Sequence, residues 1–148
     1  MFNRATNLLN GGEVYAHCDL MCGVYDPAQA RIEAQSVYNA VKIYQDTDDE
    51  ITKQRALQIK EERAEMVKHH LWVLWTDYFK KNHAEKFDNL HDLFWRATKA
   101  AGAVKKTAKL EDVEKLINLV DEVGKIFEQT KDGYEYKRVL KNITIQAK

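Results

Sequence analysis

The chain has only two cysteines and one proline among its 148 residues, and it has no surplus of either charge. Two cysteines are too few for the disulfide framework of a small secreted domain. Lysine and arginine together number 23, as do aspartate and glutamate, so the basic surplus of a typical nucleic-acid-binding protein is missing. An apolar run of transmembrane length is also missing. We therefore expect neither nucleic acid nor a membrane as a partner.

Residues 1–16, MFNRATNLLNGGEVYA, do not form a typical export signal. A secretory signal has an apolar core of roughly 7–15 residues, whereas Asn, Arg, Gly and Glu interrupt the apolar residues here. Asn10-Gly11-Gly12 is a turn signal. Two interpretations remain open. The segment is either an irregular N-terminal tail or a pro-segment, whose removal after the small residue Ala16 would make His17 the new N-terminus.

The body of the chain predicts helices. Asp26 and Pro27 form a good helix start, because aspartate caps helices and proline fits the first helical position. Apolar residues then recur at spacings of three and four up to Asp46, and again from about Asp48 to Lys81. Two further stretches of this kind follow, with apolar positions at Leu90, Leu93, Phe94, Ala97, Ala101 and Val104, and at Val113, Leu116, Ile117, Val120, Val123, Ile126 and Phe127.

Four amphipathic helices with short links predict an all-α fold, the antiparallel four-helix bundle. The predicted connection between the second and third helices is residues 82–88, and the fourth helix ends before Asp132. A chain of this length is most simply one domain. We therefore expect a bundle domain at residues 17–148 after the pro-segment, with an irregular segment at 17–25 and a tail at 132–148.

Both cysteines lie in HCDLMCGVYDP, residues 17–27, directly before the first predicted helix. The spacing Cys18-x3-Cys22 leaves three interpretations open: idle thiols, a disulfide that closes a small loop, or a pair of metal ligands. An internal His17 would add an imidazole, which makes three ligands, fewer than the four of a closed structural zinc site.

A His17 freed by cleavage would add its amine as well. Amine, peptide nitrogen and the two thiolates can then form a square around one metal, with the imidazole in the axial position. This set suits Ni(II) or Cu(II) better than zinc. Because thiolates and an ionised amide donate charge, they favour a higher oxidation state, and we predict redox chemistry.

The stretch HCDLMCGVYDPAQARIEA, residues 17–34, resembles the nickel hook and first helix of the nickel superoxide dismutase family, and IKEERAEMVKHHLWVLWTDYFK, residues 59–80, resembles that family's second helix. The resemblance covers roughly residues 17–131. It implies a cytoplasmic homohexamer of four-helix bundles, with one nickel ion per chain that binds after a processing protease has removed the pro-segment. Nickel would alternate between Ni(II) and Ni(III), converting the substrate superoxide to oxygen and hydrogen peroxide.

The resemblance also assigns metal ligands. His17 would supply its amine and axial imidazole, Cys18 its backbone nitrogen and thiolate, and Cys22 its thiolate. Asp19, inside the hook, would help to hold its fold and joins the catalytic set.

Four residues beyond the ligands have implied roles. Tyr25 would stand over the open face of the metal and restrict access to small molecules. Glu33 and Arg63 would orient the axial imidazole, a role in which partners of a ligand tune the metal site. Tyr78 matches a further tyrosine near the site.

Two other functions remain open on the residues alone. One is a copper- or nickel-binding helical bundle that carries metal without dismutase turnover, which the soft thioether of Met21 favours. The other is a purely structural helical oligomer with a cysteine pair near its N-terminus. Metal-dependent superoxide removal would discriminate against both.

Met21 departs from the family's hook, which has proline at this position. The family's Leu–Pro bond is associated with the turn that returns the second cysteine to the metal, and a non-proline cis bond would cost about 2.5–4 kcal/mol. We expect Met21→Pro to retain nickel more strongly than the natural chain. Nickel content of the two proteins after dialysis measures this, and equal retention would contradict the prediction.

Overall fold

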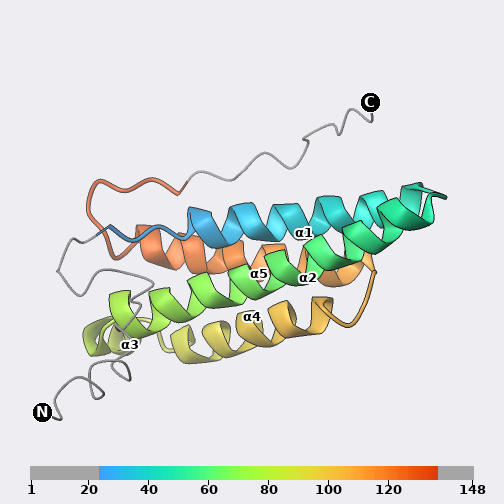
Figure 1. The fold of residues 1–148 in the computed structure, drawn as a ribbon. Helices are drawn as coiled ribbons and strands as arrows, with labels where there is room; N and C mark the ends of the chain where they lie inside the picture. The colour runs from blue at the N-terminus through green and yellow to red at the C-terminus, as the bar shows by residue number, and fades with distance from the viewer. Residues whose placement is uncertain (1–23, 137–148) are drawn as a thin grey trace, which may run out of the picture.

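The computed structural model describes residues 24–136, and these form an antiparallel four-helix bundle with one short extra helix (Figure 1). The helices of this part of the chain are α1 (Ala28–Asp46), α2 (Glu50–Val73), the π-helical turn η2 (Leu74–Tyr78), α3 (Lys81–Lys86), α4 (Leu90–Val104) and α5 (Leu110–Glu128). The predicted all-α bundle is confirmed. Within the same residues no helix is long and apolar enough to cross a membrane.

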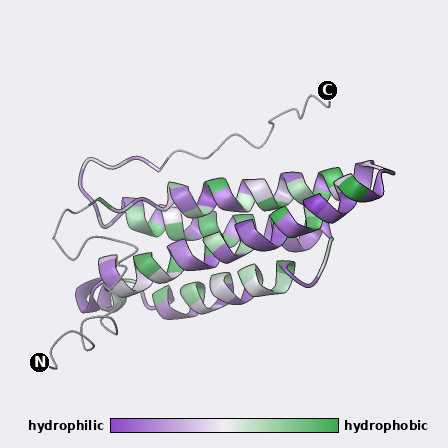
Figure 2. Ribbon diagram, in the orientation of Figure 1, coloured by the Kyte–Doolittle hydropathy of each residue, from purple (hydrophilic) through white to green (hydrophobic). Residues whose placement is uncertain are grey.

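The core lies between the four long helices, where their apolar stripes meet. Purple and green alternate along the helices in Figure 2, the pattern of an amphipathic element. Helix α1 packs on α2 and α5, and α4 packs on the same two helices. Small buried residues on the facing sides of α1 and α2 allow these helices to approach closely: Ala30, Ala34, Ala40, Ala56 and Ala64.

Lys60 occupies a buried position in the stripe of α2, which the apolar pattern of the sequence did not predict. The residue is only 3% exposed, and its Nζ donates hydrogen bonds of 2.8 Å to the carbonyl oxygens of both Lys105 and Thr107. Burial lowers the pKa of the Lys60 ammonium. Its two carbonyl partners belong to the connection between α4 and α5, so Lys60 fastens that connection to α2.

Two predicted boundaries in the middle of the chain are wrong. Helix α2 does not continue to Lys81, because η2 follows Val73 and the chain leaves it at Phe79, whose N–H bonds to the Leu74 carbonyl at 2.9 Å. The predicted connection at residues 82–88 contains α3. Apolar spacing does not reveal a change of hydrogen-bond register, and α3 has no buried residue that could produce a periodic signal.

A buried ion pair joins the first and last long helices. Arg31 of α1 is fully buried, and its Nε donates to Asp121 Oδ1 of α5 at 2.9 Å. Arg31 Nη1 also donates to Gln35 Oε1 at 3.2 Å, and the Tyr136 hydroxyl donates to the same Asp121 oxygen at 3.0 Å. Charges removed from water in this way are tolerated only when they are paired and hydrogen-bonded.

We expect Arg31→Met to lower the free energy of unfolding by about 3 kcal/mol, because it leaves the Asp121 carboxylate buried without its cation. Urea denaturation measures the loss. The matched control is Arg96→Met, since Arg96 pairs with Asp92 at 2.6 Å on the surface and exposed pairs contribute about 0–1 kcal/mol. Equal losses in the two variants would contradict the prediction.

Candidate metal centre

The hook predicted at residues 17–25 reaches the described part of the chain only at its last two residues. His17, Cys18, Asp19, Met21 and Cys22 lie outside the described residues. The chain enters the bundle through Val24, Tyr25, Asp26 and Pro27, directly before α1. Pro27, predicted as the first helical residue, lies at the N-cap of α1, and Asp26 lies one position before it. The Asp26 Oδ1 nevertheless accepts the N–H of Ala28, the first residue of α1, at 2.7 Å.

The structure brings two of the predicted site residues together at this entry point. The rings of Tyr25 and Tyr78 lie 5.6 Å apart between centroids, tilted by 53°. Tyr78 is the last residue of the π-helical turn, and such turns frequently occur at functional sites. Both side chains are half-buried, so the two rings pack against the protein and are also partly exposed to solvent.

Tyr78 belongs to an aromatic cluster at the hook end of the bundle. Its ring lies 4.3 Å from that of Phe127 and 5.1 Å from that of Phe79, both of which are buried. Phe127 in turn contacts Tyr134 at 4.9 Å. The cluster therefore links η2, α5 and the segment after α5, and it fixes the ring against which Tyr25 packs.

The direction of the Tyr78 hydroxyl follows from a count of protons. The Tyr78 and Thr130 hydroxyl oxygens lie 2.9 Å apart, and Thr130 donates its single proton to the Phe127 carbonyl at 2.7 Å. Tyr78 must therefore donate to Thr130 Oγ1. Its hydroxyl proton points at the bundle rather than at Tyr25.

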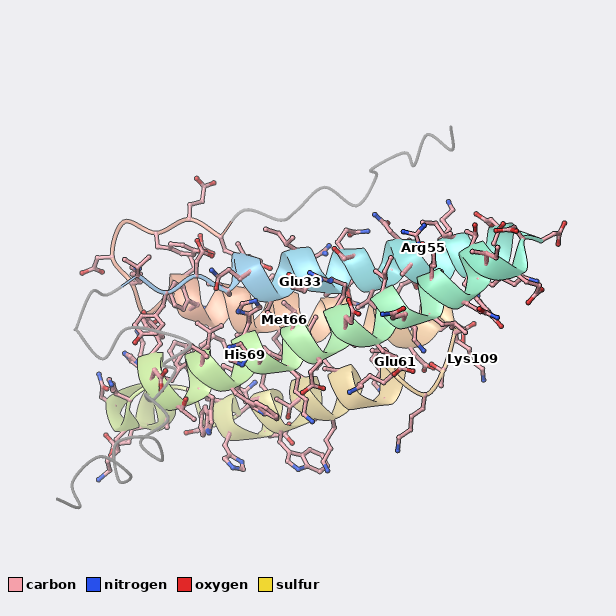
Figure 3. The ribbon with its side chains drawn as sticks, viewed as in Figure 1. Glu33, Arg55, Glu61, Met66, His69 and Lys109 are labelled. Carbon is pink, nitrogen blue, oxygen red and sulfur yellow. The ribbon has the colours of Figure 1, made fainter. Side chains whose placement is uncertain are left out.

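Glu33 and Arg63 form the second pair that the structure brings together. Arg63 Nη1 of α2 donates to Glu33 Oε2 and Oε1 of α1 at 3.3 and 3.5 Å. In Figure 3, Glu33 lies on α1 and His69 lies on the neighbouring helix α2. The Glu33 side chain is 16% exposed and that of Arg63 is 40% exposed, so the carboxylate is the more enclosed partner. Both contacts are long, which leaves the carboxylate with capacity for a further donor.

Sequence reasoning missed the residues after α5 that touch this entry point. Tyr134 donates its hydroxyl to Asp26 Oδ1 at 2.6 Å, and Lys131 Nζ donates to the Tyr25 carbonyl at 3.4 Å. Burial, followed by the hydrogen bond to Asp26, raises the pKa of Tyr134, so its hydroxyl stays a donor at neutral pH. No local motif marks these residues, because their partners lie more than a hundred positions away.

The described residues do not themselves form a metal site. Among residues 24–136 no three His, Cys, Asp or Glu side chains are placed to hold a metal ion. His69 and His70, which invite such an interpretation, lie edge to face at 5.7 Å on α2 and are half-buried. Candidate metal donors therefore remain those of the segment before Val24.

Comparison with known proteins covers the hook residues as well as the bundle. The sequence pattern of nickel-containing superoxide dismutases matches residues 12–131. A nickel superoxide dismutase of Streptomyces seoulensis is 49% identical over 119 residues, which is 80% of this chain and 91% of the relative. One of Streptomyces coelicolor is 48% identical over 118 residues, 80% of this chain and 90% of the relative.

Solved structures agree with the sequence comparison. A native nickel superoxide dismutase matches with a TM-score of 0.74 at 47% identity, over 77% of this chain and 97% of that chain. An apo structure matches with a TM-score of 0.71 at 45% identity, over 73% and 97% of the two chains. Fold and sequence together define the class as an all-α metalloenzyme. The chain belongs to the nickel-containing superoxide dismutase family.

We expect Tyr78→Phe to lower the free energy of unfolding by about 1 kcal/mol, because it removes the hydrogen bond to Thr130 and keeps the ring contacts. Thermal or urea unfolding measures this. The control is Tyr44→Phe, which removes a tyrosine hydroxyl near the C-terminal end of α1, the end away from the hook. A Tyr78→Phe loss no larger than the control's would show that the Thr130 contact does not hold Tyr78.

Proposed function

We propose that this chain is a superoxide dismutase whose nickel ion is held by residues 17–22. The observation that carries the proposal is the family match at residues 12–131, which spans this segment and the bundle together. Relatives that carry the name nickel superoxide dismutase are aligned over nine-tenths or more of their own length.

The donor set of this segment fits nickel. His17, Cys18 and Cys22 offer an imidazole, an amine after processing, a peptide nitrogen and two thiolates, a combination suited to a tetragonal Ni(II) or Cu(II) site. When bound, nickel would supply one-electron chemistry, through which one superoxide is oxidised to oxygen and a second is reduced, with two protons, to hydrogen peroxide. Asp19 is proposed to hold the fold of the hook between the ligands.

Tyr25 and Tyr78 are proposed to limit what reaches the metal. Tyr25 is three residues after Cys22, and its ring rests on Tyr78, whose hydroxyl is fixed by Thr130. The hydrogen bond to Thr130 keeps Tyr78 in position, and with it the ring of Tyr25 that rests on it. Superoxide is small enough to pass these two rings, whereas larger reductants and chelators are not.

Glu33 and Arg63 are proposed to orient the imidazole of His17. The Glu33 carboxylate is largely enclosed and keeps acceptor capacity beyond its long contacts with Arg63. A carboxylate that accepts the second ring N–H of a ligating histidine fixes the ring's orientation, and loss of such partners typically costs about 10–100-fold in metal affinity or activity.

The remaining parts of the proposal concern processing and assembly. A protease removes residues 1–16, so that the amine of His17 becomes available, and the protein works as a homohexamer in the cytoplasm. The exposed apolar side chains of α1 and α2 support an assembly, since Ile32, Ile51, Ile59 and Trp72 are 42–71% exposed.

The test is intact mass and metal content of the protein isolated from its own cells, followed by an assay of superoxide removal. We expect a mass that begins at His17 and about one nickel per chain. Cys18→Ser is expected to lose more than about 100-fold in nickel affinity and all measurable turnover, because a direct ligand is removed.

The matched control is His91→Gln, which changes an exposed histidine of α4 and should keep both nickel and activity. His17→Gln would remove the imidazole donor and should lose most of the turnover. A processed protein without nickel, or one with nickel but without superoxide removal, would refute the proposed function.

A further inference from the structure

Residues 131–136, here named the C-terminal strap, return from the end of α5 to the start of α1. In Figure 1 the orange-red loop after α5 turns back at the end of the bundle where the blue chain enters α1. The family match ends at Lys131, so the rest of the strap lies beyond it. Three side chains attach this segment to the bundle.

The first attachment is at the last turn before α1. The Tyr134 hydroxyl donates to Asp26 Oδ1 at 2.6 Å, and this oxygen is the one that accepts the Ala28 N–H at 2.7 Å. The Tyr134 ring rests on Phe127 at 4.9 Å. Tyr134 therefore fixes the carboxylate that binds the first N–H of α1, four residues after Cys22.

The second attachment is at the buried ion pair. Tyr136 donates to Asp121 Oδ1 at 3.0 Å, on the same oxygen that binds Arg31. Its ring covers Gly124 of α5 so closely that a Cβ at this glycine would lie 2.5–2.6 Å from the ring carbons. Glycine at position 124 thus provides the space in which the ring lies.

The third attachment reaches the hook's own last residue. Lys131 Nζ donates to the Tyr25 carbonyl at 3.4 Å and lies over the rings of Phe127 and Tyr134 at 5.5 and 5.8 Å. The strap thus contacts the backbone of Tyr25 and the side chain of Asp26. It also contacts the Asp121 carboxylate, which pairs with Arg31.

We propose that the C-terminal strap positions the metal hook, with Tyr134 and Tyr136 as positioning residues that hold the hook's junction with α1 in place. The inference rests on the proposed function, because the hook is the nickel site only if that function holds. The strap acts by restricting the four described residues before α1, Val24 to Pro27, and thereby slows the loss of nickel from the hook that precedes them.

The first measurement needs no metal. Amide hydrogen exchange of Ala28, followed by NMR in the full nickel-free chain, reports whether the hydrogen bond from Ala28 to Asp26 stays in place. Tyr134→Phe should speed this exchange about fivefold, the factor expected for the loss of one ordinary hydrogen bond. Tyr38→Phe, a half-buried tyrosine in the middle of α1, is the control and should leave it unchanged.

The second measurement displaces the strap without altering its own side chains. Gly124→Ala should push Tyr136 away from α5, whereas Gly102→Ala places a Cβ in open space on α4. Both changes raise helix propensity by similar amounts, so neither should unfold its helix. We expect nickel to leave processed, loaded Gly124→Ala and Tyr134→Phe several-fold faster in the presence of a chelator, with Gly102→Ala and Tyr38→Phe like the natural protein.

The outcomes separate the strap from the proposed function. Unchanged Ala28 exchange in Tyr134→Phe overturns the inference, whatever the metal does. Faster exchange with an unchanged rate of nickel loss also overturns it, because the strap then stabilises only the bundle. A natural protein that binds no nickel refutes the proposed function instead, and faster Ala28 exchange in Tyr134→Phe would in that case still show that the strap holds the junction with α1.

Discussion

The buried ion pair between Arg31 and Asp121 is the interaction on which the arrangement of the hook end depends. It joins α1, which follows the hook, to α5, which precedes the strap, at 2.9 Å and without access to water. A buried charge pair is a poor source of net stability, but it has a strict geometry. The pair sets how α1 lies against α5, and Tyr136 binds the same carboxylate oxygen.

Around that pair, aromatic rings form most of the contacts at the hook end. Tyr25, Tyr78, Phe127 and Tyr134 contact one another in sequence, from the residue that ends the hook to the strap. Rings of this kind contribute large contact areas with few rotatable bonds. The segment proposed to bind the metal is thereby joined to a rigid surface, the support that a geometrically demanding metal site requires.

Much of the fold and some of the candidate site could be predicted from the sequence. The helical stripe of α4 was predicted position by position, because the six apolar residues of the predicted stripe are the ones that α4 buries in the core. Glu33 and Arg63 were predicted as a pair, and their side chains do meet. Lys60 was not predicted to be buried, because its partners are backbone carbonyls, which every residue has. The roles of Tyr134 and Tyr136 were missed for a similar reason, since an isolated tyrosine in a mixed tail has no pattern.

The sequence by itself determined the four long helices, and it predicted the donors that precede the first of them, because periodicity and ligand chemistry are local properties of the chain. Only the tertiary structure decided that Tyr25 lies on Tyr78, that Arg31 meets Asp121 and that the strap fastens Asp26. These contacts all join residues more than fifty positions apart in the sequence. Which of many polar and aromatic side chains meet at such separations depends on how the four helices pack, and that is a property of the whole core.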